Sequence, residues 1–271
     1  MTGPQKLTLN KKGEVSWKCF TPTLSRKTEL AVEATVGGRK KRIPVDSDGV
    51  ARAEFGQFKQ GKIPVEAKLL DLTGKRILAV DRGNLFSRPK EDYSAPHNVE
   101  IDEFGRVMVG GKPFMPIGLF AAMIVEMKDT TALKKIKEAG FNTLLSIGYV
   151  NPYGGIKDTP EQTLRALCNE LQKYDLKYIF SIKNQIELPK GTKPRGRYKW
   201  GKYTNKKQIT DMTVKTLRNH PAMLAWYVSD ENALGEIPAI RALRERISMN
   251  DPYHPVLTLT DKVGNFQHFA N

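Results

Sequence analysis

The second part of the chain alternates compact apolar runs with amphipathic helices, and this order constrains the fold more than any other feature. The apolar runs are "PFMPIGLF", "NTLLSI", "KYIFSI", "AMLAWYV" and "PVLTLT". Runs of this kind are typical of strands that are covered on both faces. Strands that are separated by helices pair in parallel, with right-handed crossovers. We therefore expect a parallel sheet built from β-α units.

The four segments between these runs carry helix signals. They are expected at about residues 130–139, from Pro160 onward, at about 205–218 and at about 237–249. The second helix opens with a capping box, because Thr159 precedes Pro160 and Gln162 follows at the third helical position. The residues expected to face the core are Leu133, Ile136, Leu164, Leu167, Cys168, Leu171, Ile209, Met212, Leu217, Ile240, Leu243 and Ile247.

Periodicity alone leaves two architectures open for these elements. Five strands and four helices could form a doubly wound open sheet, or the first part of an eight-stranded barrel that continues after Asn271. In both architectures the chemistry belongs at the carboxyl ends of the strands.

The first part of the chain has a different pattern. Short alternating segments separated by turn signals, such as "TELAVEATV" before Gly37 and Gly38, run from residue 6 to about 88. This spacing predicts an antiparallel β-sandwich. We expect the sandwich at 1–90, a polar linker containing proline at 91–98, and the β-α domain at 99–271.

Composition excludes several classes of protein. No apolar run approaches the roughly 18 residues of a membrane helix, so no membrane association is expected. The first residues lack the apolar region of a secretory signal, so the protein is either cytoplasmic or has lost its signal. Cys19 and Cys168 are expected to be two separate buried thiols. The histidines show no metal-ligand spacing and no phosphate-binding glycine loop is present, so neither a metal nor a cofactor is expected.

One apolar run ends on two acids. If "AMLAWYV" is a strand, Asp230 and Glu231 emerge at its carboxyl end, beside Trp226 and Tyr227. Partial desolvation there could raise a carboxyl pKa, as proton donation to a leaving group requires. The alternative is that one of the acids simply caps the next helix.

Several segments resemble the clan A glycoside hydrolases, especially the family 2 β-galactosidase and β-glucuronidase type. "NHPAMLAWYVSDEN" at 219–232 is similar to the fourth barrel strand of that family, which ends in Asn-Glu. The segment 99–120 resembles the passage into the first strand, 133–145 resembles the first helix and second strand, and 244–260 resembles the passage into the fifth strand. Together they cover about 99–260.

The resemblance implies an immunoglobulin-like β-sandwich followed by a partial (β/α)8 TIM barrel with about five strands and four helices. It implies that Glu231 is the general acid/base of a glycosidase. Asp230 would replace the asparagine that contacts the sugar 2-hydroxyl, with Tyr227 and Trp226 as further substrate contacts. The family takes its second carboxylate from strand seven, which lies beyond this chain. Asp261 is the one acid of this chain that could supply the second carboxylate of an inverting mechanism. The resemblance also implies an extracellular or periplasmic protein.

A basic loop follows the third apolar run. Residues 183–207 contain nine Lys or Arg against one Glu, within a formal net charge of +15. Its site candidates are Arg195, Arg197, Tyr198 and Trp200. Aromatic rings interleaved with cations suit an anionic glycan. They also suit a nucleic-acid strand. The third interpretation is a solvated loop that binds no ligand. The expected partner is a carbohydrate, and a second copy or a complementary barrel fragment is the further partner considered. The alternative function is a non-catalytic carbohydrate- or nucleic-acid-binding protein.

Overall fold

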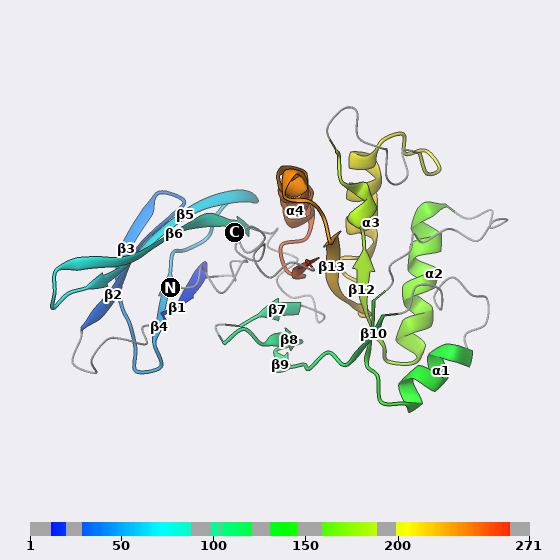
Figure 1. The fold of residues 1–271 in the computed structure, drawn as a ribbon, viewed down its shortest axis with the longest axis horizontal. Helices are drawn as coiled ribbons and strands as arrows, with labels where there is room; N and C mark the ends of the chain where they lie inside the picture. Colours follow the sequence, from blue (N-terminus) through cyan, green and yellow to red (C-terminus); the bar gives the residue numbers. More distant parts are fainter. Residues whose placement is uncertain are drawn as a thin grey trace. The chain divides into compact units, whose positions relative to one another are not determined.

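The computed structural model describes residues 12–19, 29–87, 99–102, 104–120, 131–145, 159–188 and 199–260. The chain divides into two compact units, Met1–Phe114 and Met115–Asn271. Figure 1 labels the elements of both units.

The first unit contains antiparallel sheets around one core. A four-stranded sheet has the order β3-β2-β5-β6, and a two-stranded sheet pairs β1 with β4. The strands are β1 (Glu14–Lys18), β2 (Leu30–Val36), β3 (Arg39–Pro44), β4 (Val50–Glu54), β5 (Gly61–Asp71) and β6 (Arg76–Ser87). Buried side chains of both sheets, including Trp17, Val32 and Leu69, belong to a single hydrophobic cluster. The antiparallel pairing predicted for this region is confirmed.

The basic segment 37–42 forms a hairpin. Gly37 and Gly38 connect β2 to β3 and have φ values of 54° and 81°. Positive φ at both central residues is the geometry of a tight hairpin turn that matches the strand twist, which explains the two glycines. Lys40 forms an ion pair with Glu33 at 3.1 Å, and Arg39 lies over the Phe58 ring at 4.2 Å. The basic residues therefore line an edge strand, where charge discourages pairing with another chain.

Residues 99–113 form a small three-stranded antiparallel sheet. It consists of β7 (Val99–Ile101), β8 (Val107–Val109) and β9 (Lys112–Pro113). This sheet belongs to the first unit, whereas the sequence pattern assigned residues from 99 onward to the second domain. The expected linker at 91–98 lies outside the described residues.

The second unit is a parallel β-α structure. Its strands are β10 (Gly118–Phe120), β11 (Thr143–Leu145), β12 (Lys177–Ser181), β13 (Met223–Asp230) and β14 (Val256–Leu259). The helices are α1 (Thr131–Glu138), α2 (Pro160–Lys173), α3 (Lys206–Leu217) and α4 (Ile237–Asn250), with short 3-10 turns η3 (Lys183–Gln185) and η4 (Leu234–Glu236). All four strand pairs are parallel, as predicted. The order β10-β11-β12-β13-β14 is sequential, without the reversal that defines a doubly wound sheet.

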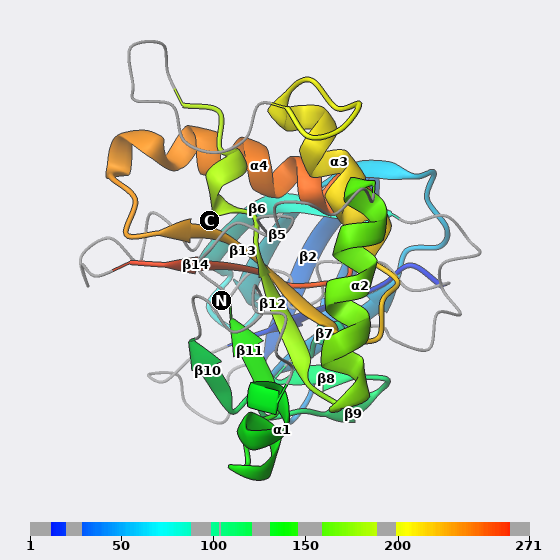
Figure 2. The same cartoon turned by 90° about the vertical axis from the view of Figure 1, so that its right-hand side faces the viewer.

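The helices form as their sequence signals predict. Thr159 caps α2, and both hydrogen bonds of the capping box with Gln162 are present. The expected apolar faces pack inward: Leu167 is partly buried and the other expected residues are buried, all but Ile209 in one cluster with side chains of the sheet. Helices α2 and α3 lie side by side against the sheet (Figure 2). Cys19 and Cys168 are both free and buried, as expected. Among the described residues, every helix is too short or too polar to cross a membrane.

Burial differs between the middle and the edges of the parallel sheet. All residues of β13 except the last are buried. The prediction of strands covered on both faces is wrong for β10 and β14, where Phe120 is 49% exposed and Leu257 is 38% exposed. The physical reason is their position: these two strands are the edges of the sheet in the described part of the chain.

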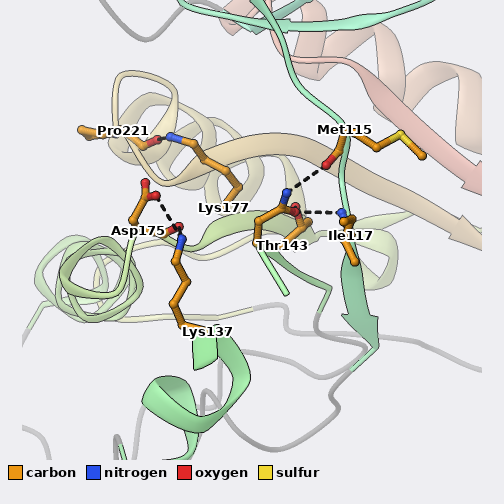
Figure 3. A network of polar contacts seen from close by, with 8 residues as sticks. Met115, Ile117, Lys137, Thr143, Asp175, Lys177 and Pro221 are labelled. Atoms are coloured by element: carbon orange, nitrogen blue, oxygen red, sulfur yellow. Dashed lines mark hydrogen bonds and ion pairs between the residues drawn. The ribbon is translucent and has the colours of Figure 1, made fainter. Parts of the chain in front are cut away.

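Polar side chains tie the strands together at their amino ends (Figure 3). Asn142 donates from Nδ2 to the Met115 carbonyl and accepts the Ile117 amide at Oδ1, both at 2.8 Å. Lys177 Nζ donates to the Pro221 carbonyl at 2.8 Å and so links β12 to the start of β13. The side chains of Asn142 and Lys177 therefore have a structural role at this end of the sheet, because they form hydrogen bonds with backbone groups.

Replacing Asn142 with alanine should destabilise the protein. The variant removes two hydrogen bonds to exposed backbone groups before β10, and a hydrogen bond of this kind typically contributes about 0.5–1.5 kcal/mol. Urea denaturation of the whole chain measures the loss. Lys134→Ala is the control, because it removes only an exposed ion pair with Glu138, which contributes about 0–1 kcal/mol. Equal effects of the two variants would contradict the role given to Asn142.

Candidate functional site

Strand β13 sends its side chains to two different faces. Trp226 and Val228 belong to the core between the sheet and the helices. Tyr227, the residue between them, points to the opposite face because side chains alternate along a strand. The pairing of β13 with β14 shifts register between Tyr227 and Ser229. An irregularity of this kind changes the direction of the side chains that follow it.

Trp226 is a core residue, and we no longer include it among the candidate site residues. It is fully buried, and its indole Nε1 donates to Asp251 Oδ2 at 2.7 Å. Its ring makes edge contacts with Phe180 and His254. The sequence placed Trp226 beside the acids because these residues are near one another in the chain, but alternation along the strand turns its ring into the core shared with the helices.

Asp230, Lys183 and Tyr227 meet at the carboxyl ends of β12 and β13. The Lys183 ammonium, from η3, forms a close ion pair with Asp230 Oδ2. It also lies 5.7 Å from the centre of the Tyr227 ring. The side chains of Lys183 and Asp230 are 15% and 27% exposed, so the pair is sheltered but still reachable from solvent.

This arrangement sets the charge state of the two β13 side chains. Burial by itself would raise the pKa of Asp230, but the contacts with Lys183 and with the Tyr227 hydroxyl outweigh it, and the pKa is lowered. Burial and the adjacent Asp230 carboxylate raise the pKa of Tyr227. The expectation of a raised carboxyl pKa is therefore wrong for Asp230, which is held ionised.

Glu231 follows the strand in an unusual backbone conformation. Its φ is 53°, in the left-handed region that residues other than glycine seldom adopt. Its amide donates to the Leu259 carbonyl of β14 at 3.0 Å, and its side chain is exposed. Strained backbone of this kind is often found where function requires a fixed side-chain direction.

Neither acid caps a helix. The residue that precedes η4 is Ala233, and Glu236 precedes α4, without a side-chain cap in either case. Asn232, which the sequence analysis did not single out, closes the turn: its Oδ1 accepts from the Asp230 amide at 2.9 Å. Its Nδ2 donates to Glu236. The capping explanation for the two acids is thus wrong, because an amide side chain organises this turn instead.

The described part of the basic loop is anchored to the fold. Trp200 is half-buried and packs against the core of the unit, and its backbone pairs with Tyr203. The Tyr203 hydroxyl contacts Glu161 at the start of α2. Lys206 is buried and donates to the Ile186 carbonyl. The loop candidates Arg195, Arg197 and Tyr198 lie outside the described residues, as does Asp261.

Much of the charge in the described part of this loop is compensated. Lys183 pairs with Asp230, Lys202 lies 3.7 Å from Glu161, and Lys207 lies 3.3 Å from Glu187. Within the residues that the structure describes, no group of three or more His, Cys, Asp or Glu side chains could hold a metal ion.

Lys183 is the site residue that the sequence analysis missed. Its signal was available, because it follows the end of "KYIFS" as Asp230 and Glu231 follow the end of "AMLAWYV". The carboxyl ends of neighbouring parallel strands lie at the same edge of a sheet, so residues at those ends are expected to meet.

Comparison with known proteins gives distant likenesses. No family model and no curated protein matches this chain. Among solved structures it is similar to a putative glycoside hydrolase from Bacteroides vulgatus ATCC 8482, with 17% identity over 94% of this chain and 56% of that chain and a TM-score of 0.40. It is similar to a β-glucuronidase from Bacteroides uniformis, with 14% identity over 96% of this chain and 33% of that chain and a TM-score of 0.40.

A third likeness is to the exo-chitosanase of Amycolatopsis orientalis, with 13% identity over 92% of this chain and 30% of that chain and a TM-score of 0.34. These structural neighbours are glycoside hydrolases at low identity. The chain spans between 30% and 56% of the length of the three proteins, and likenesses at these scores do not by themselves assign a function.

Replacing Asp230 with asparagine should destabilise the protein at neutral pH and have little effect in acid. The native pKa of Asp230 is lowered, so its contribution is complete above the unfolded value of about 3.9 and disappears as the pH falls through the native value. A hydrogen bond to a charged group contributes about 1.5–3 kcal/mol.

Thermal unfolding of both proteins between about pH 2 and pH 7 spans this transition. Asp48→Asn controls for the loss of an exposed negative charge. A difference between wild type and Asp230→Asn that stays constant down to the lowest pH would contradict the ion-pair explanation.

Proposed function

We propose that this chain is part of a glycoside hydrolase, with Glu231 as the general acid/base. The observation that carries the proposal is the position of Glu231: an exposed carboxylate directly after a buried parallel strand, in a left-handed conformation that no helix cap explains. The carboxyl ends of parallel strands are where enzymes with this type of sheet place their chemistry.

For the fold, we propose an immunoglobulin-like sandwich in the first unit and the first five strands of a (β/α)8 barrel in the second. Two sheets around one core support the sandwich. Five parallel strands in sequential order, each joined to the next by a helical segment, support the barrel. The exposed apolar side chains of β10 and β14, such as Phe120 and Leu259, would then be covered by further barrel strands or by a second copy.

The chemistry assigns different tasks to the two neighbouring acids. Glu231 would donate a proton to the glycosidic oxygen as the bond breaks, and would later accept one from water. Asp230 is unsuited to proton donation, because its ion pair with Lys183 keeps it ionised. It would accept a hydrogen bond from a sugar hydroxyl.

The reaction also needs a second carboxylate. Retaining glycosidases place the two groups roughly 5 Å apart, and inverting enzymes place them roughly 6.5–9.5 Å apart. We propose that this group comes from outside the described residues. The substrate is a carbohydrate, and an acidic glycan would suit the basic loop 183–207. Of the loop aromatics, Trp200 contributes mainly by packing, since it lies against the core.

Replacing Glu231 with glutamine in the full-length natural protein should abolish the hydrolysis of aryl glycosides with poor leaving groups. The N–H groups of an amide are not acidic enough to protonate a leaving group, so turnover should fall about 10²–10⁴-fold. For glycosides of 2,4-dinitrophenol, the rate of the bond-breaking step should fall less, because that leaving group departs without being protonated.

Release of the phenol, followed by absorbance, measures both rates. Glu138→Gln is the matched control, because it makes the same change at an exposed glutamate at the end of α1. Unchanged turnover of the poor substrates by Glu231→Gln would refute the assignment.

A further inference from the structure

Lys183 and Asp230 form a sheltered pair of opposite charges at the edge of the sheet that carries Glu231. They come from the ends of adjacent strands, β12 and β13, and their side chains are 15% and 27% exposed. The Asp230 backbone is fixed by its hydrogen bond to Asn232, and the Tyr227 ring, itself buried, supports the ammonium from one side.

The pair retains hydrogen-bonding capacity that the ion pair does not use. An ammonium has three hydrogens, and a carboxylate can accept at about four sites. In the described part of the structure, Lys183 directs one hydrogen to Asp230 Oδ2. The remaining capacity is a donor and an acceptor side by side, which is the pattern that two neighbouring hydroxyl groups of a sugar ring complement.

We propose that Lys183 is a specificity-determining residue, which together with Asp230 binds a pair of adjacent hydroxyls on a neutral sugar. This inference rests on the proposed function, and it names the chemistry of one subsite. The Lys183 ammonium donates to the oxygen of one hydroxyl, and the Asp230 carboxylate accepts the hydrogen of the other.

The charge balance favours a neutral group at this position. Asp230 compensates Lys183, so the pair has no net charge to attract an anion, and a sugar carboxylate would also face the Asp230 carboxylate. An acidic glycan would therefore direct its anionic group to other residues, such as the basic loop. Hydrogen bonds with charged groups are stronger than those between neutral groups. A pair of hydroxyls would form one such bond with the Lys183 ammonium and one with the Asp230 carboxylate.

A purely structural ion pair between β12 and β13 is the rival explanation. Such a pair would affect stability but would leave sugar binding unchanged in variants that remain folded. The experiment therefore measures binding in folded variants, and it compares a conservative with a non-conservative replacement at Lys183.

The probes are methyl β-D-glucopyranoside, methyl β-D-galactopyranoside and the sodium salt of methyl β-D-glucuronide, titrated into the whole chain and followed by ligand-observed NMR. The variants are Lys183→Met, Lys183→Arg, Asp230→Asn and the double variant Lys183→Met/Asp230→Asn, which leaves no unpaired charge if a single variant fails to fold. Circular dichroism confirms folding of each.

The matched control is Lys137→Met/Asp175→Asn. It removes an ion pair of the same chemical type, with a 3.0 Å separation, at the opposite end of the sheet (Figure 3). This pair is more exposed, with Asp175 83% exposed, and it is far from the carboxyl ends of the strands, so sugar binding should be unchanged.

We expect wild type to bind the neutral glycosides through their adjacent hydroxyls. Lys183→Met and the double variant should weaken that binding about tenfold or more, a change of about 1.4 kcal/mol. Lys183→Arg, which keeps a charged donor beside Asp230, should retain most of it.

Two results would overturn the inference. If Lys183→Met or the double variant binds the neutral glycosides like wild type, the inference fails while the proposed function stands. If wild type binds none of the probes, the inference also fails, and the proposed function is then judged by the hydrolysis measured with Glu231→Gln.

Discussion

The position of β13 inside the parallel sheet determines where the charged side chains of the candidate site can lie. Its backbone pairs with β12 on one side and β14 on the other, and all of its residues except Asp230 are buried. A buried backbone must have its polar groups paired, and an unpaired charge is costly there. Charged side chains are therefore accommodated at the end of this strand. Asp230 and Glu231 occupy that end, where the sheet meets solvent.

The same constraint explains why the charges at this edge are matched. The chain has a formal net charge of +15, yet the two sheltered lysines in the described part of the site region have partners: Lys183 pairs with Asp230, and Lys206 donates to the Ile186 carbonyl. Partly buried cations need such partners. The excess charge of the protein is thus poor evidence about this site, and the local pairs are the better guide.

Local sequence signals predicted the elements well and the site only in part. The capping box at Thr159 and the glycine turn at Gly37 form as expected, because each depends on residues that are neighbours in the chain. Trp226 was grouped with the acids on proximity alone, and the structure places it in the core. Lys183 follows the end of its own strand as Asp230 does, but the two are 47 residues apart in sequence, and only the pairing of β12 with β13 identifies them as partners.

The sequence by itself determined the β-α order, the parallel sheet and the acids at the end of one strand, because hydrophobic periodicity and caps act over a few residues. The tertiary structure decided which strands are edges, which face each side chain of β13 takes, and which cation pairs with Asp230. It also decided the left-handed backbone of Glu231, whose amide bonds to β14. These features depend on contacts between segments far apart in the chain, and they exist only once the strands have paired.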